Sequence, residues 1–199
     1  LHPRVRRQRQ MCKETGDKKN ITVNGVTYAA QIIGFDHDTL TTADGGRTKA
    51  GITFQLVDCL KTTYSMNGSN TNVNGWRGST MRTSTMATLL NQLSSDLKSV
   101  LKFVNKVTSV GNNSSGLETT SDKLFLLSEI EVFGATQYSY AGEGKQYEYY
   151  TAGNSTIKKV NGSANYWWER SPYSGGTDTF CCVYSNGNAT YNNASYSFG

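Results

Sequence analysis

The sequence has none of the features that mark a membrane-spanning protein, a zinc protein or an exported disulfide-linked domain. No apolar run approaches the roughly 20 residues that cross a bilayer, and no basic start followed by an apolar stretch marks a signal peptide. The chain has two histidines and four cysteines, Cys12, Cys59, Cys181 and Cys182, without a CxxC pair or a His-containing zinc pattern. We therefore expect no metal site and no disulfide framework.

Charge is also scarce, and most of the excess lies at one end. Charged residues make up 18% of the 199 residues, and the formal net charge is +5. Residues 1–20 contain seven basic and two acidic side chains, whereas the other 179 residues contain 13 of each sign. Phosphate binding needs basic side chains on the folded domain, so this division argues against nucleic acid as its partner. We expect a flexible basic head over residues 1–20 and a single domain over residues 21–199.

Hydrophobic patterning predicts an α+β fold in which a few helices pack on antiparallel β-hairpins. The Asn24-Gly25 dipeptide is typical of a tight turn between strands over residues 21–26 and 26–35. Residues 109–116 are polar and predict a loop. The other expected elements are a strand over residues 51–59, helices over residues 79–93 and 94–100, a strand over residues 101–107, and C-terminal strands over residues 165–170, 179–184 and 190–198.

Two groups of acidic residues have side chains suited to chemistry, but a structural interpretation is favoured for both. Consecutive Asp36, His37 and Asp38 could be metal ligands, yet consecutive residues seldom converge on one ion. Glu129 and Glu131 could form a carboxylate pair for acid–base work, but no nucleophile–base set accompanies them.

The tryptophan pair before the last segment has two interpretations. Trp167 and Trp168, close to Arg170, could form a cation–π platform for a sugar. More often, such a pair lies on a strand with one indole in the core and the other at its edge.

The last 29 residues have the composition of a recognition surface. Ser171–Gly199 contains five Ser, four Tyr, four Asn, four Gly and three Thr, and Asp178 is its only charged residue. Antibody paratopes use the same residues, because tyrosine offers a large amphipathic contact area at low entropic cost while Ser, Gly and Asn offer adaptable hydrogen bonds. The composition therefore predicts a binding surface in preference to a polar tail.

The same segment lacks five residue types altogether. Lys, Glu, Gln, Met and Trp account for 33 of the preceding 170 residues and for none of these 29. No codon that ends in a pyrimidine encodes any of the five, and every residue in the segment is reachable from an asparagine codon by changing its two adenines. Protein physics does not explain this absence, whereas a mutational process does.

The chain ends with the residues YWWERSPYSGGTDTFCCVYSNGNATYNNASYSFG. This segment resembles the variable region of proteins that are diversified by diversity-generating retroelements, in which template adenines are randomised during reverse transcription. Four upstream blocks resemble the DUF6273 family of gut Firmicutes and their prophages: AGITFQLVDCL, NVNGWRGSTMR, TSDKLFLLSEIEVFG and GEGKQYEYY. Together the resemblance covers residues 21–199.

The resemblance implies a C-type-lectin-like fold, related in architecture to the formylglycine-generating enzymes, that displays variable side chains on a rigid β scaffold. It implies a non-catalytic protein on a phage tail or a bacterial surface, which binds a protein or glycan receptor. We expect no cofactor and no calcium requirement. The alternatives are an oxidase like the formylglycine-generating enzymes, suggested by Cys181 and Cys182, and contact of DNA or RNA with the basic head.

The resemblance also assigns the residues of the variable region, which spans residues 166–199. Trp168, Arg170 and Pro172 would be framework, and Glu169 stands where the family often has an apolar residue. Template asparagine codons, and so the ligand-binding residues, would correspond to Tyr173, Gly175, Gly176, Asp178, Thr179, Cys182, Tyr184, Thr190, Tyr191, Asn192, Asn193, Tyr196 and Phe198.

Strand alternation agrees with this assignment in part. Cys182 and Tyr184 should share the outer face of their strand, while Cys181 and Val183 should face the core.

Overall fold

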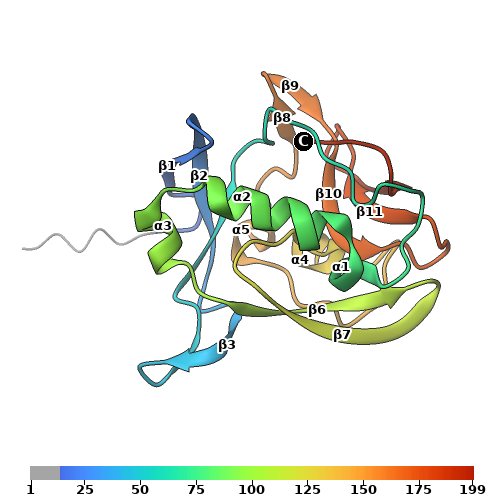
Figure 1. Cartoon of the computed structure of the whole chain (residues 1–199), viewed down its shortest axis with the longest axis horizontal. Helices are drawn as coiled ribbons and strands as arrows, with labels where there is room; N and C mark the ends of the chain where they lie inside the picture. The colour runs from blue at the N-terminus through green and yellow to red at the C-terminus, as the bar shows by residue number, and fades with distance from the viewer. Residues whose placement is uncertain (1–13) are drawn as a thin grey trace, which may run out of the picture.

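The computed structural model describes residues 14–199, and β-strands dominate it (Figure 1). Strand residues make up 39% and helical residues 17%. The longest helix, α2 (Met86–Gln92), has seven residues. The predicted α+β fold with helices packed on hairpins is therefore wrong, and so is the C-type-lectin-like architecture expected with it, because small antiparallel sheets form most of the molecule. Within residues 14–199, no helix is long and apolar enough to cross a membrane.

The first sheet has the order β1-β2-β5 and contains β1 (Lys18–Val23), β2 (Val26–Phe35) and β5 (Ile52–Leu56). The predicted turn at Asn24-Gly25 is confirmed: both residues have positive φ, as a two-residue hairpin turn requires. Residues 1–13 of the predicted head lie outside the described residues. Its last three residues belong to β1, so the folded domain begins earlier than expected.

The second sheet has the order β4-β3-β6-β7 and contains β3 (Thr39–Asp44), β4 (Arg47–Lys49), β6 (Val104–Gly111) and β7 (Ser114–Asp122). The loop predicted over residues 109–116 is wrong, because most of that segment is strand. The chain reverses within Asn112-Asn113, where both residues have positive φ. Asparagine tolerates this conformation better than other non-glycine residues, which lets the turn be short.

A broken helical run lies between the blue N-terminal strands and the orange C-terminal strands in Figure 1. It consists of α1 (Gly75–Gly78), a π-helical turn η1 (Met81–Thr85), α2 and α3 (Ser95–Val100). The run meets the first sheet where Leu93 forms a bridge with Val23. At its other end, the buried Trp76 donates its indole N–H to Asp122 at 3.0 Å. The run thus connects β1 to the end of β7.

The C-terminal sheet has the order β10-β11-β12 and packs on both faces. It contains β10 (Trp167–Pro172), β11 (Thr179–Val183) and β12 (Ala189–Asn193). On one face, Trp167 and Val183 join a core cluster with Tyr147. On the other face, Trp168 joins a cluster with Met66, Trp76 and further residues, which include Phe180 and Cys182. Every residue of β10 and β11 is buried.

Three smaller elements remain. Helix α4 (Glu129–Phe133) begins with a capping box, in which the Ser128 hydroxyl accepts from the Glu131 N–H and the Glu131 carboxylate accepts from the Ser128 N–H. Helix α5 (Glu148–Thr151) and the hairpin of β8 (Lys158–Val160) and β9 (Ser163–Asn165) complete the fold. Helix α4 packs against β10 and helix α5 against β2.

Two glycines allow the loop before α1 to lie directly against the end of β6. A Cβ on Gly111 would lie 1.9 Å from the carbonyl oxygen of Asn72, and a Cβ on Gly75 would lie 2.1 Å from the carbonyl oxygen of Ser109. Both glycines also have positive φ, at +73° and +49°. The close approach is therefore possible only without side chains at these two positions.

We predict that Gly111→Ala destabilises the fold more than Gly25→Ala. Both glycines have φ near +74°, but nothing lies within 4 Å of the position of a Gly25 Cβ. Gly25→Ala should therefore cost only the left-handed backbone strain, about 1 to 2 kcal/mol. Gly111→Ala should cost about 1 to 3 kcal/mol more because the loop must move away. Urea unfolding of both variants measures the difference, and equal losses would contradict the close approach.

Candidate ligand-binding surface

Three tyrosines, Tyr138, Tyr173 and Tyr191, form a cluster beside the C-terminal sheet, and we call them the tyrosine cluster. The rings of Tyr173 and Tyr191 are stacked, with centroids 3.9 Å apart and planes inclined by 5°. Tyr138 meets both rings edge-on, at 5.1 Å from Tyr191 and 6.2 Å from Tyr173. Tyr191 is 39% exposed, so the cluster presents an aromatic surface to solvent.

The loop that follows Tyr173 supports its ring and brings a carboxylate next to it. A Cβ on Gly175 would lie 2.5 Å from the Tyr173 hydroxyl, so the ring lies over this glycine. A Cβ on Gly176 would lie 3.1 Å from Asp178 Oδ1 and 3.2 Å from Tyr173 Cδ1. The exposed Asp178 and the edge of the ring therefore flank the same residue. Side chains at either glycine would displace the tyrosine ring or the carboxylate.

A buried asparagine holds this loop from below. Asn72 donates its side-chain N–H groups to the carbonyl oxygens of Gly176 at 2.8 Å and Thr179 at 2.9 Å. Its side-chain oxygen accepts the backbone N–H of Asn112 at 2.8 Å, and its backbone N–H donates to the carbonyl oxygen of Thr177. One fully buried amide thus joins the loop after β10 to the turn between β6 and β7.

The segment that carries Tyr138 holds the loop from the side. The N–H and hydroxyl of Ser174 both donate to the carbonyl oxygen of Tyr138, at 2.8 and 2.7 Å. The Tyr140 hydroxyl donates to the carbonyl oxygen of Ser174 at 3.2 Å. The buried carboxylate of Glu129 in turn accepts the N–H groups of Tyr138 and Ser139. The tyrosine cluster therefore has hydrogen-bonded backbone on both sides.

A second aromatic group lies on the other face of the sheet. Tyr184 meets Tyr166 edge-on at 4.6 Å, Tyr166 stacks on Phe198 at 5.0 Å, and Phe198 contacts Trp168 at 4.6 Å. Trp168 pairs with Cys182 across the strands, whereas Tyr191 pairs with Cys181. Since neighbouring residues of β11 face opposite sides, the two aromatic groups belong to different faces. The predicted binding residues therefore do not form one continuous patch.

Two of the predicted contact residues are buried. Cys182 is completely inaccessible, and Thr179 is 7% exposed. Alternation predicted an outward Cys182, but the face it shares with Phe180 packs on the core cluster that includes Met66 and Trp76. This is a correction to the sequence interpretation, because neither side chain can touch a ligand in this conformation.

The other predicted residues are accessible to differing degrees. Tyr196 is 51% exposed and Tyr184 is 39% exposed. The remaining positions are exposed or half-buried: Gly175, Gly176, Asp178, Thr190, Asn192, Asn193 and Phe198, with Tyr173 and Tyr191 in the tyrosine cluster.

An uncharged hollow with a volume of about 610 Å³ lies along residues 67–80, the segment that contains Asn72. Asn70 belongs to the segment that lines the hollow, and its side-chain oxygen accepts from the hydroxyl of Ser195 at 2.5 Å. The hollow therefore lies next to the C-terminal segment. The hollow offers amide, hydroxyl and backbone groups and no charged side chain. It is lined by Asn67, Gly68, Ser69, Thr71, Val73, Asn74, Gly78 and Thr80.

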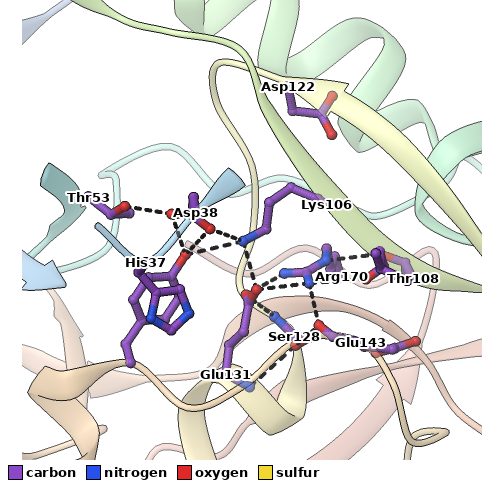
Figure 2. Close-up of polar contacts among 12 residues, drawn as sticks. His37, Asp38, Thr53, Lys106, Thr108, Asp122, Ser128, Glu131, Glu143 and Arg170 are labelled. Atoms are coloured by element: carbon purple, nitrogen blue, oxygen red, sulfur yellow. Dashed lines mark hydrogen bonds and ion pairs between the residues drawn. The ribbon is translucent and has the colours of Figure 1, made fainter. Parts of the chain in front are cut away.

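A buried network of charged side chains lies beneath β10 (Figure 2). Arg170 binds the Glu131 carboxylate with both terminal nitrogens, at 2.5 and 3.0 Å. Lys106 lies 2.7 Å from Glu131 and 2.8 Å from Asp38. The Tyr147 hydroxyl donates to Asp38 at 2.9 Å. Two cations and two carboxylates thus balance one another in a region where each is at most 4% exposed.

The cations keep the two carboxylates ionised. Burial by itself would raise the pKa of Asp38 and of Glu131. The charge of Lys106 beside Asp38, and those of Arg170 and Lys106 beside Glu131, outweigh burial and hold both pKa values below the usual range. Asp38 and Glu131 are therefore both ionised at neutral pH, and each pairs with a buried cation.

Two other buried carboxyl groups, Glu143 and Glu169, form no ion pair within residues 14–199. Glu143 accepts the N–H of Ser109 at 2.8 Å and the hydroxyl of Ser171, and burial raises its pKa to about 7. Neither side-chain oxygen of Glu169 has a hydrogen-bond partner within residues 14–199. Burial, together with nearby Glu129 and Glu143, raises the pKa of Glu169 well above its usual range. A neutral Glu169 fits a position that is expected to be apolar.

The acidic residues considered from the sequence have structural contacts. Asp36 pairs with Arg47 on the surface at 3.1 Å, whereas Asp38 lies in the buried network. His37 stacks on Tyr147, with centroids 3.8 Å apart. Glu129 holds the backbone of the segment after α4. Across residues 14–199, no three His, Cys, Asp or Glu side chains come together in a way that could hold a metal ion.

The paired tryptophans and the paired cysteines are all buried. Trp167 and Trp168 are 5% and 2% exposed, so they form no open sugar platform. Burial raises the pKa of the thiols of Cys181 and Cys182. A raised thiol pKa disfavours the thiolate that nucleophilic or metal-binding cysteine chemistry uses.

Sequence reasoning missed two residues of the candidate surface. Tyr138 lies more than thirty positions before Tyr173 in a segment without a strong pattern, and Asn72 lies in an Asn/Gly-rich loop. The composition of residues 67–78 predicted a loop, and the NVNGWRGSTMR block begins with Asn72, but neither assigned a role to this residue.

The comparisons with known proteins find one family. Residues 50–199 match the family described as "Domain of unknown function (DUF6273)". All four blocks that carried the resemblance lie inside this match, so it confirms the expected family from residue 50 onward. No curated protein and no solved structure matches the chain.

We predict that Glu143 makes the fold less stable as pH rises from about 4.5 to about 7. Because its pKa is about 7 in the folded state and near 4.5 when unfolded, the unfolded chain loses this proton first. The stabilisation is complete below about pH 4.5, declines up to about pH 7 and stays constant above it. In the wild type, this titration should lower the free energy of unfolding by about 2 to 4 kcal/mol over that range, and Glu143→Gln should remove this decrease.

Urea unfolding of the wild type and Glu143→Gln at pH 5 and pH 8 measures this decrease. Glu14→Gln is the control, because Glu14 is exposed. Identical pH dependence in the wild type and Glu143→Gln would refute the assignment.

Proposed function

Since this chain belongs to the DUF6273 family, whose description names no activity, we propose a function from its own surface: it is a non-catalytic binding protein. Its C-terminal segment, residues 166–199, contacts a protein or glycan receptor. The observation that carries this proposal is the tyrosine cluster, in which the exposed ring of Tyr191 stacks on Tyr173, next to a loop that is held from two sides. Binding sites concentrate affinity in such rigid aromatic anchors.

The support beneath the cluster favours binding as well. Loops that must order themselves on contact lose affinity to the entropy of ordering. Here Asn72 donates to the loop backbone, Ser174 of the loop donates to the carbonyl oxygen of Tyr138, and the buried carboxylate of Glu129 orders the segment that carries Tyr138. Binding of a ligand would therefore cost little conformational entropy of the loop.

We further propose that a retroelement diversifies this surface. Ser171–Gly199 contains only residues that asparagine codons reach by changes at their two adenines. Many of the positions assigned to variation are exposed or half-buried, and the residues around them are anchored by buried side chains. Such a division suits a protein on a phage tail or a bacterial surface, where the receptor changes and the scaffold does not.

We predict that Tyr191→Ala and Tyr196→Ala weaken receptor binding by about tenfold or more, because truncation removes an exposed aromatic anchor. The probe is the labelled full chain, tested against a panel of intact bacterial strains by flow cytometry and against a glycan array. Phe54→Ala and Phe103→Ala are matched controls, since these aromatic residues are 47% and 51% exposed and lie outside the candidate surface. Equal binding by all four variants would refute the proposed surface.

Diversification makes a separate prediction about the genome. A near-identical repeat of the segment that encodes Ser171–Gly199 should lie beside a reverse transcriptase gene, with asparagine codons at the assigned positions. Sequencing the source locus tests this prediction. A locus without the repeat would remove the retroelement while leaving the binding proposal intact.

A further inference from the structure

We propose that the tyrosine cluster and Asp178 together bind the cationic side chain of an Arg or Lys residue on a partner protein. This inference rests on the proposed binding function and names the chemistry that the surface selects. It follows from the charge of the segment, the position of its single carboxylate and the exposed ring of Tyr191.

The charge of the segment is the first observation. Asp178 is the only charged residue of Ser171–Gly199, which contains neither Lys nor Arg. The preceding cation, Arg170, is fully buried and bound to Glu131, so it cannot reach the surface. Asp178 is exposed, and its carboxylate forms no ion pair or hydrogen bond with any other residue of 14–199. The surface therefore carries a free negative charge with no cation of its own segment to neutralise it.

The position of this carboxylate is the second observation. Asp178 Oδ1 and the ring edge of Tyr173 both lie next to Gly176, at 3.1 and 3.2 Å from the place that a Cβ would take. The Tyr173 ring in turn stacks on Tyr191 at 3.9 Å. The Asp178 carboxylate thus lies beside the edge of the Tyr173 ring, and that ring stacks on the exposed Tyr191.

Aromatic rings and a carboxylate complement a cation in two ways. The ring quadrupole attracts an ammonium or a guanidinium over its face, and the carboxylate pairs with it directly. The guanidinium of arginine is planar and stacks on aromatic faces as well. A neutral sugar would use the ring faces and gain nothing specific from the charge, so the unpaired Asp178 favours a cationic partner.

The test uses three small probes and nuclear magnetic resonance of the full chain. N-acetyl-arginine amide and N-acetyl-lysine amide carry the proposed charge, and N-acetyl-norleucine amide is their neutral control. We expect the two cationic probes to shift the ring resonances of Tyr138, Tyr173 and Tyr191 in a saturable way, and the neutral probe to leave them unchanged. Raising the salt concentration should weaken the binding.

Variants separate the contribution of the charge from that of the rings. Asp178→Asn should weaken the cationic probes by about two- to fivefold, as expected for a solvent-exposed ion pair. Tyr191→Ala should weaken them further. Asp96→Asn is the control, since Asp96 is an exposed acid on α3, away from the cluster. Equal shifts with norleucine amide, or unchanged binding by Asp178→Asn, would overturn the cationic partner.

The same variants distinguish this inference from the proposed function. If Tyr191→Ala abolishes binding to cells or glycans while Asp178→Asn has no effect, the surface binds its receptor without a cation and only the inference fails. If Tyr191→Ala, Tyr196→Ala and Asp178→Asn all leave receptor binding unchanged, both proposals fail. A neutral glycan as the best binder on the array would also overturn the inference.

Discussion

The paired contact between Arg170 and Glu131 is the interaction on which the rest of the structure depends. It joins β10 to α4 in the centre of the molecule, and Arg170 also donates to the carbonyl oxygens of Leu126, Val107 and Glu143. A buried ion pair adds little stability compared with a well-packed apolar pair, but loss of one partner leaves an uncompensated charge and costs about 3 to 5 kcal/mol. The arrangement of these chain segments is therefore specified by charge.

The candidate surface extends outward from this centre. Ser171, next to Arg170, accepts the N–H of Glu129 at 3.0 Å and donates its hydroxyl to Glu143. Glu129 then fixes the backbone of Tyr138, whose carbonyl oxygen holds Ser174. A continuous series of hydrogen bonds thus runs from the buried charges to the tyrosine cluster. The backbone beside the exposed positions is therefore held by Glu129 and Ser174, neither of which is among the positions assigned to variation.

Sequence reasoning succeeded where the information is local. The Asn24-Gly25 turn follows from two adjacent residues that tolerate positive φ. The helix over residues 95–100 follows from the capping residue Ser94, whose hydroxyl accepts the N–H of Leu97. It failed where packing decides. Cys182 reads as outward by alternation, yet β11 is the central strand of its sheet and has core side chains on both faces.

The sequence by itself determined the composition of the C-terminal segment Ser171–Gly199: its tyrosines, its single acid and the five residue types it lacks. These depend only on which residues are present. The tertiary structure alone decided that Tyr138 joins Tyr173 and Tyr191, that Phe198 and Tyr184 belong to the opposite face, and that Asn72 holds the loop. Each of these contacts joins residues that are distant in sequence or depends on strand register, and no local pattern encodes such a pairing.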